Sequence, residues 1–232
     1  MKVFFRGIWN HFSVWTSRTS SRIFGKIFGT LIKKDRRRRL FHGCIFSFFI
    51  ELHVTIANML KLTHFDAPSR AFTTRVAFGI ANVDFEDERI TYSELETRRG
   101  ENGSSTEVPL GGLPVLTLPN GKAICQSGAI TRYAAKRAGL YPSDPEQSLL
   151  VDEIIECAAD AYTQAPQDKD DAVKKQKREE FAAGYLKKLF NLFAQRLAGA
   201  GPYICGENLT IADIQLYGVV KAIRGGSFGT YF

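Results

Sequence analysis

Short stretches of apolar or alternating residues run through the chain between residues 60 and 125, which predicts β-strands. The predicted strands are Leu60–Phe65, Asp84–Thr91, Val115–Leu118 and Ala123–Cys125. Asn120-Gly121 separates the last two strands and predicts a tight hairpin, because both residues tolerate the positive φ of such turns. Polar residues with several Gly and Ser fill residues 92–110, where we expect a loop with a weak helix.

Apolar residues three and four positions apart predict helices between and after these strands. The first helix would begin near Pro68, which suits a first turn, and would run to about Ala81. Its inward side chains would be Ala71, Ala77, Phe78 and Ile80. The second would begin with Ser127 as its N-cap and end at Gly139.

Everything after the breaker cluster at residues 142–145 has helical spacing. The predicted helices cover Glu146–Thr163, Asp168–Leu197 and a segment that follows a capping box at Thr210–Asp213. The order of elements is therefore β-α-β, then β-β-α, then helices only. We expect a thioredoxin-like α/β domain at residues 59–141 and an all-α domain at residues 146–232. The first strand–helix–strand unit predicts parallel pairing, and the hairpin adds an antiparallel edge.

Positive charge is concentrated in the first 58 residues. They hold 11 Lys and Arg against two acids, whereas residues 59–232 hold 20 Lys and Arg against 22 acids. The body is therefore near neutral, and we expect no nucleic-acid partner for it. The four cysteines show no CxxC spacing, which argues against a metal site or a disulfide scaffold and favours a reducing compartment.

The N-terminal extension, residues 1–58, has several interpretations. Its first 34 residues lack acids and carry an amphipathic, Arg- and Ser-containing pattern that is typical of a transit peptide, which would be mitochondrial. Arg36–Arg39 would also suit a nuclear signal or a membrane surface, if the extension is retained. The apolar run Leu40–Ile50 is about half the ~20 residues that span a bilayer. The other interpretation of these residues is a reading artefact or a poorly ordered tail before Met59. We expect a cytoplasmic protein, with a mitochondrial location through the extension as the alternative.

Residues 109–139 combine a proline loop, the hairpin and a helix that starts with polar residues. Together with the flanking elements they resemble the cytosolic glutathione S-transferases, most closely the sigma-like group. The segments that carry the resemblance are Lys61–Phe65, Val83–Ile90, Pro109–Leu116, Gln126–Tyr133, Val151–Ile154 and Asn208–Asp213. It covers residues 59 to about 224 and implies that family's fold, C-terminally incomplete, in a homodimer.

The resemblance implies a site for glutathione as co-substrate. Ser127, at a helix N-terminus, would offer a hydroxyl, backbone N–H groups and the positive dipole end to the γ-glutamyl carboxylate. Gln126 would add an amide contact, although Ser127 is also interpretable as a cap alone. Leu113, before a cis Pro114, would present its backbone to the cysteinyl residue. Arg70, near the start of the first helix, is a further substrate-binding candidate.

Other candidates are less specific. Asp160 lies where the family places an acid that reaches the γ-glutamyl amine in the partner subunit, but a solvated helix residue fits equally. Arg98 or Arg99 would meet the glycyl carboxylate. Phe65 and Tyr162 are candidates for the apolar wall of the second-substrate site.

The thiol-activating position departs from the family pattern, which has a tyrosine where this chain has His64. A free thiol with a pKa of ~8.5 is only a few per cent ionised at pH 7, so an enzyme has to stabilise the thiolate. His64 is the candidate catalytic residue. The hydroxyl groups of Thr63 and Ser69 are alternatives, and a third interpretation is that no side chain activates the thiol effectively.

The predicted function is transfer of the glutathione thiolate to small apolar electrophiles, as in detoxification. The alternatives are a glutathione-dependent isomerase and a non-catalytic protein that binds glutathione or a hydrophobic ligand.

Overall fold

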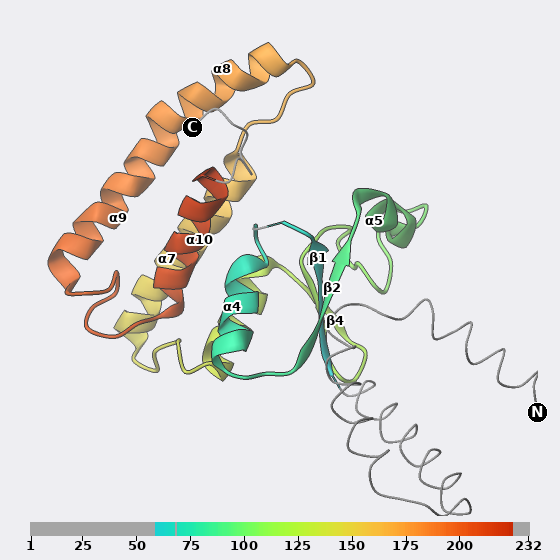
Figure 1. Ribbon diagram of the computed structural model, residues 1–232, viewed down its shortest axis with the longest axis horizontal. Coiled ribbons are helices and arrows are strands. Elements are labelled where there is room, and N and C mark those ends of the chain that lie inside the picture. Colours follow the sequence, from blue (N-terminus) through green and yellow to red (C-terminus); the bar gives the residue numbers. More distant parts are fainter. Residues whose placement is uncertain (1–58, 68, 225–232) are drawn as a thin grey trace, which may run out of the picture. The chain divides into compact units, whose positions relative to one another are not determined.

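The computed structural model describes residues 59–67 and 69–224 (Figure 1). The predictions for residues 1–58 and for Pro68 lie outside the described residues. The strands are β1 Leu60–Phe65, β2 Phe85–Ile90, β3 Val115–Thr117 and β4 Ala123–Cys125. The helices are α4 Phe72–Ile80, α5 Tyr92–Arg99, α6 Ser127–Arg137, α7 Pro145–Gln164, α8 Asp171–Phe181, the π-helix η1 Ala182–Leu186, α9 Lys187–Ala200 and α10 Ile211–Arg224.

The four strands form one mixed sheet in the order β2-β1-β3-β4. β1 and β2 are parallel, because α4 crosses between them, whereas β3 runs antiparallel to both β1 and β4. The hairpin between β3 and β4 is closed by the hydrogen bond from Leu118 N to Lys122 O, at 2.9 Å. The predicted fold class, a thioredoxin-like α/β domain followed by helices, is confirmed.

The weak helix expected within residues 92–110 is α5, which takes up the first eight of them. The Thr91 hydroxyl accepts a hydrogen bond from Glu94 N at 3.2 Å, and the Glu94 carboxylate accepts one from Thr91 N at 2.6 Å. This capping box ends the strand at Ile90 and starts α5 at Tyr92. The predicted helix was therefore underrated, since its signal lies in the cap and not in an apolar stripe.

The inward face predicted for α4 is partly wrong. Ala71, Ala77 and Phe78 are fully buried, whereas Ile80 is 47 % exposed. Two residues advance the side-chain direction by about 200° around a helix, so Ile80 points away from the side on which Phe78 packs.

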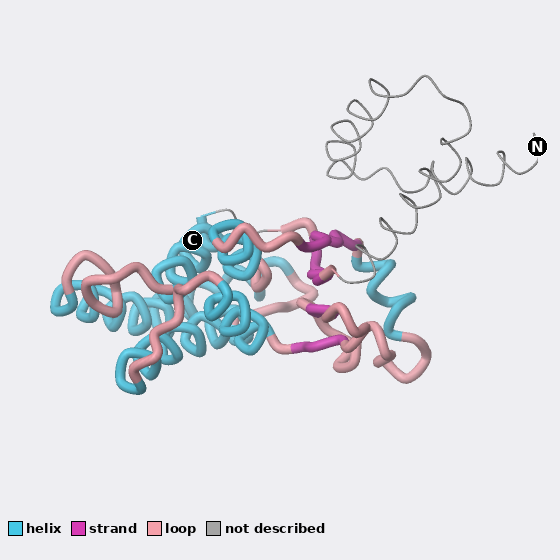
Figure 2. Tube along the Cα trace, turned by 90° about the horizontal axis from the view of Figure 1, so that it is seen from below, coloured by secondary structure: helices cyan, strands magenta, loops and turns pink. Residues whose placement is uncertain are grey.

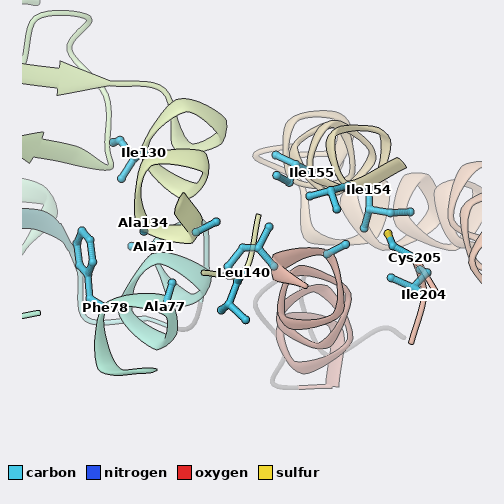
Figure 3. Packing of buried hydrophobic residues seen from close by; sticks show 14 of the residues in the cluster. Ala71, Ala77, Phe78, Ile130, Ala134, Leu140, Ile154, Ile155, Ile204 and Cys205 are labelled. Atoms are coloured by element: carbon cyan, nitrogen blue, oxygen red, sulfur yellow. The ribbon is translucent and has the colours of Figure 1, made fainter. Parts of the chain in front are cut away.

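Most of the apolar core lies between the sheet face covered by α4 and α6 and the helices α7 and α10 (Figure 3). Leu140 stands between these two groups of helices, and its carbonyl accepts a hydrogen bond from Ile211 N at 2.9 Å. Figure 2 shows the strands gathered at one end of the described residues and the long helices at the other. One buried cluster thus spans both predicted domains, and the boundaries at residues 59–141 and 146–232 stay a prediction.

A smaller cluster covers the opposite face of the sheet, where α5 packs. Its buried members are Ile90, Leu95, Val108 and Val115, with Phe65 and Leu113 partly buried beside them. This cluster anchors the irregular segment between α5 and β3, because Val108 is only 1 % exposed.

α6 ends as the sequence predicts. Gly139 takes a φ of 67°, and Leu140 N donates to Ala135 O at 2.9 Å, which closes the helix in a Schellman motif. Across the described ranges, no helix is both long and apolar enough to cross a membrane.

Candidate functional site

A cavity of about 190 Å³ opens where the loop before β3 meets the start of α6. Its lining residues are Arg70, Leu110, Gly112, Leu113, Pro114, Cys125, Gln126 and Ser127. The cavity therefore brings together five of the residues predicted to bind substrate, Arg70, Leu113, Pro114, Gln126 and Ser127. The Leu113–Pro114 peptide bond is cis, as the resemblance implied.

The start of α6 differs by one residue from the prediction. The N-cap is Gln126, with φ 76° and ψ 108°, and no side chain caps the helix. Ser127 is the first helical residue, because an N-cap needs the non-helical backbone that Gln126 adopts. The prediction that Ser127 is the N-cap is wrong. Ser127 lines the cavity, and no side chain provides a cap hydrogen bond.

The cavity has a positive electrostatic character. It is lined by the Arg70 guanidinium and by the N-terminus of an eleven-residue helix whose first turn carries no acid. Among its lining residues in the described part of the chain, none is acidic. A helix N-terminus attracts a carboxylate through its N–H groups and its dipole. The cavity is therefore suited to an anionic ligand.

Arg70 is held by the helical part of the chain. One of its nitrogens donates to Thr163 Oγ1 at 3.0 Å, and its guanidinium carbon lies 5.5 Å from the centre of the Tyr162 ring. Burial lowers the pKa of Arg70 below its usual value, and burial raises the pKa of Tyr162 to about 12. The contact with α7 thus fixes the cation that the cavity presents.

His64 is buried, with 3 % of its surface exposed, and is not among the residues that line the cavity. Its Nδ1 lies 3.2 Å from Phe65 O, and its Nε2 lies 3.3 Å from Ser69 Oγ. A carbonyl oxygen only accepts, so Nδ1 carries the proton and Nε2 accepts from the Ser69 hydroxyl. Both ring nitrogens are therefore engaged within the chain.

The charge state of His64 follows from its surroundings. The pKa of His64 is lowered to about 4, mainly by burial and also by the charges of Arg75 and Arg70, while the hydrogen bond to Phe65 O and the charge of Asp87 oppose this shift. The ring is neutral at pH 7. A neutral ring with Nδ1 protonated has no second N–H to offer to a thiolate.

Two predicted site residues lie away from the cavity lining. Phe65 stacks on Tyr92, with ring centres 6.5 Å apart, and packs in the smaller cluster under α5. Asp160 is exposed on α7. Its proposed contact is with a partner subunit, so its place in a single chain leaves that proposal standing as a prediction.

The two arginines proposed for the glycyl carboxylate are engaged within the chain. Arg98 forms a pair of hydrogen bonds with the carboxylate of Glu88, at 2.8 and 3.0 Å. Arg99 donates to the Glu96 carboxylate and to the carbonyl oxygen of Gly111. Neither arginine lines the cavity.

Sequence reasoning missed three lining residues, Leu110, Gly112 and Cys125. All three lie within residues 109–139, the segment that was singled out, although none was named as a site residue. In the described residues, no group of three or more His, Cys, Asp or Glu side chains is placed to hold a metal ion.

Comparison with known proteins identifies the family. Residues 60–136 match the model of the glutathione S-transferase N-terminal domain, and residues 158–230 match that of the glutathione S-transferase C-terminal domain. The two matches together cover more than half of the chain. The chain belongs to the glutathione S-transferase family.

Individual members of the family agree with this assignment. The chain is 27 % identical over 175 residues to the class-mu 28 kDa glutathione S-transferase of Schistosoma mansoni, covering 71 % of this chain and 78 % of that protein. It is 28 % identical over 154 residues to the hematopoietic prostaglandin D synthase of Gallus gallus, covering 66 % and 73 %.

A solved structure shows the same arrangement. The prostaglandin synthase D of Nilaparvata lugens superposes with a TM-score of 0.63 at 28 % identity, covering 72 % of this chain and 82 % of that one. These glutathione S-transferase relatives confirm the resemblance to the cytosolic, sigma-like members that was drawn from the sequence.

Proposed function

We propose that this glutathione S-transferase binds glutathione in the cavity between the Leu113–Pro114 loop and the start of α6, and transfers its thiolate to small apolar electrophiles. One observation carries the proposal. The cavity gathers Arg70, the cis-proline loop, Gln126 and Ser127, which are separate in the sequence and complementary in chemistry to an anionic tripeptide.

Each lining group has a part in binding. The Ser127 hydroxyl and the first N–H groups of α6 would receive the γ-glutamyl carboxylate, and Gln126 would add an amide contact. The backbone N–H and C=O of Leu113 would pair with the cysteinyl residue. The positive charge of Arg70 would favour the anionic ligand and, if it lies near the sulfur, its thiolate form.

Activation of the thiol is the step for which the proposed site has the fewest suitable side chains. His64 is neutral at pH 7 and donates its Nδ1 proton to Phe65 O, so it would act on a thiol only after its hydrogen bonds rearrange. Lowering a thiol pKa by two units takes about 2.7 kcal/mol of selective stabilisation of the thiolate. The two hydroxyl groups considered as alternatives are also engaged within the chain: that of Thr63 donates to the Glu88 carboxylate at 2.7 Å, and that of Ser69 pairs with His64 Nε2. Arg70, which lines the cavity, is the remaining candidate for stabilising a thiolate.

This geometry favours a second candidate, a protein that binds glutathione with little turnover. Retention on immobilised glutathione tests binding, and a chain that is not retained would overturn both candidates. A conjugation assay with a chromogenic electrophile tests turnover. Substantial activity that His64→Ala abolishes supports the transferase with His64 as activator. An inactive parent and an active His64→Tyr variant support the binding protein.

A glutathione-dependent isomerase is a third candidate, because two relatives are named prostaglandin D synthases. Such a reaction returns glutathione unchanged, whereas conjugation consumes it. Following free thiol during turnover therefore separates the isomerase from the transferase.

A further inference from the structure

The side chain of Arg99 joins the end of α5 to the loop that lines the cavity. Its Nε donates to the carbonyl oxygen of Gly111, and its Nη1 donates to the carboxylate of Glu96 one turn earlier on α5. Gly112 and Leu113, which directly follow Gly111, line the cavity. Arg99 thus acts on the backbone two residues before the one proposed to clamp the cysteinyl part of glutathione.

The Gly111 backbone is confined on its other sides. Its N–H donates to Val108 O at 2.8 Å, and Val108 is buried in the cluster under α5. Gly111 takes a φ of 63°, and a Cβ added there would lie 2.1 Å from Gly103 O. With the N–H and the Cα held in this way, the carbonyl that Arg99 holds is the remaining group that sets the direction of the chain toward Leu113.

A second set of contacts connects Arg99 to the end of β1. Its guanidinium carbon lies 5.8 Å from the centre of the Tyr92 ring, and Tyr92 stacks on Phe65. Phe65 directly follows His64. The guanidinium therefore lies between the loop of the cavity and the Tyr92 ring, and Tyr92 in turn contacts the end of the strand that carries the candidate activator.

We propose that Arg99 is a positioning residue for glutathione, which holds the Gly111–Leu113 backbone in its binding conformation and does not itself bind the glycyl carboxylate. Two observations separate these roles: Arg99 does not line the cavity, and its charge is paired with Glu96. The inference rests on the proposed glutathione site.

The test compares two ligands, glutathione and its analogue with the glycyl carboxylate converted to an amide. Calorimetry gives the Kd of each for the parent chain and for Arg99→Gln. A positioning residue predicts that Arg99→Gln weakens both ligands by the same factor, on the order of tenfold, which corresponds to about 1.4 kcal/mol. Arg99→Lys, which keeps the charge and one donor, should recover part of the affinity for both.

Arg137→Gln is the matched control. Arg137 also lies in the last turn of a helix, α6, with its guanidinium carbon 5.7 Å from a tyrosine ring, that of Tyr133, but it is not among the residues of the cavity. Its replacement should leave both Kd values within about twofold of the parent, a difference of roughly 0.4 kcal/mol.

Three results would overturn the inference. If Arg99→Gln weakens glutathione and leaves the amide unchanged, Arg99 binds the carboxylate directly. If Arg137→Gln costs as much, the effect is general charge or stability. If Arg99→Gln changes neither Kd, the Gly111–Leu113 backbone keeps its binding conformation without Arg99. Should Arg99→Gln fail to fold, the same comparison of the two ligands on Arg99→Lys decides. A parent chain that binds neither ligand overturns the proposed glutathione site, and this inference with it.

Discussion

The two ends of the proposed site differ in how their polar groups are used. At the α6 end, Arg70, Gln126 and Ser127 line the cavity beside the helix N-terminus. At the β1 end, His64 is buried, and both of its ring nitrogens form hydrogen bonds, one with Phe65 O and one with the Ser69 hydroxyl. The contrast teaches that, in the proposed site, the residues that would bind the carboxylate are different from the residue that would activate the thiol. A chain can keep the first while changing the second.

The largest expected effect is a loss of folding stability at low pH, caused by the buried His64 at the β1 end. The ordinary pKa of histidine is 6.5, and that of His64 is about 4 in the folded chain. Between pH 6.5 and pH 4, His64 is therefore protonated in the unfolded state but neutral in the folded state. The contribution to stability is present above pH 6.5 and is lost as the pH falls toward 4, by about 3 kcal/mol in total.

Urea denaturation at pH 7 and at pH 4 measures this loss. Other groups titrate in the same range, so the comparison is between the parent and His64→Gln. The parent should lose about 3 kcal/mol more than the variant. An equal loss in both chains would mean that His64 is free to ionise, and the β1 end would then be open.

The next effect is a loss of glutathione affinity when the loop that lines the cavity is distorted. Gly111→Ala places a Cβ against Gly103 O and should weaken glutathione binding by about 2 kcal/mol, roughly thirtyfold. Gly121→Ala is the matched control, because Gly121 also has a positive φ, 82°, but nothing lies within 4 Å of its added Cβ. Titration calorimetry compares the two variants. Equal affinities would show that the loop does not shape the site.

Ser127→Ala sharpens the comparison at the anion-binding position. Loss of a hydrogen bond to a charged group costs about 1.5 kcal/mol, so the Kd for glutathione should rise a little more than tenfold. The melting temperature should hardly change, because Ser127 provides no cap hydrogen bond. Ser148→Ala removes a first-turn serine of α7, whose hydroxyl donates to Pro145 O, and should leave binding unchanged. An unchanged Kd for Ser127→Ala would place the carboxylate elsewhere.

The smallest effect concerns Ser69. Ser69→Ala removes the partner of His64 Nε2 and should destabilise the fold by about 1 kcal/mol, measured by thermal denaturation. Glutathione affinity should stay the same, because Ser69 does not line the cavity. A weaker affinity would mean that this hydroxyl reaches the ligand and that the two ends are not separate.

The parts that the sequence predicted well are those written in consecutive residues. The Asn120-Gly121 turn carries its backbone geometry locally, so the hairpin and its two strands were predicted. The cis Leu113–Pro114 bond was implied by the family resemblance, and the predicted start of α6 was displaced by one residue. The parallel pairing of β1 with β2 and the antiparallel hairpin of β3 and β4 were predicted, whereas the pairing of β1 with β3 was not. The family matches then confirmed the fold that these local signals implied.

The parts that the sequence did not predict depend on contacts between distant segments. The sequence suggested that Arg98 or Arg99 binds a carboxylate of the ligand. In the structure Arg98 donates to Glu88, and Arg99 donates to the Gly111 carbonyl. The engagement of His64 depends on a turn that brings back Ser69. Periodicity also gave Ile80 an inward place that its position on the helix does not allow.

A crystal structure of the chain with glutathione tests the central claim most directly. The account predicts the γ-glutamyl carboxylate at Ser127 and the first N–H groups of α6, with the cysteinyl backbone paired to Leu113. It also predicts that His64 keeps its hydrogen bonds to Phe65 O and Ser69. Glutathione bound away from the Leu113–Pro114 loop would contradict the proposed site. A His64 ring turned to donate to the sulfur would contradict the separation of binding from activation.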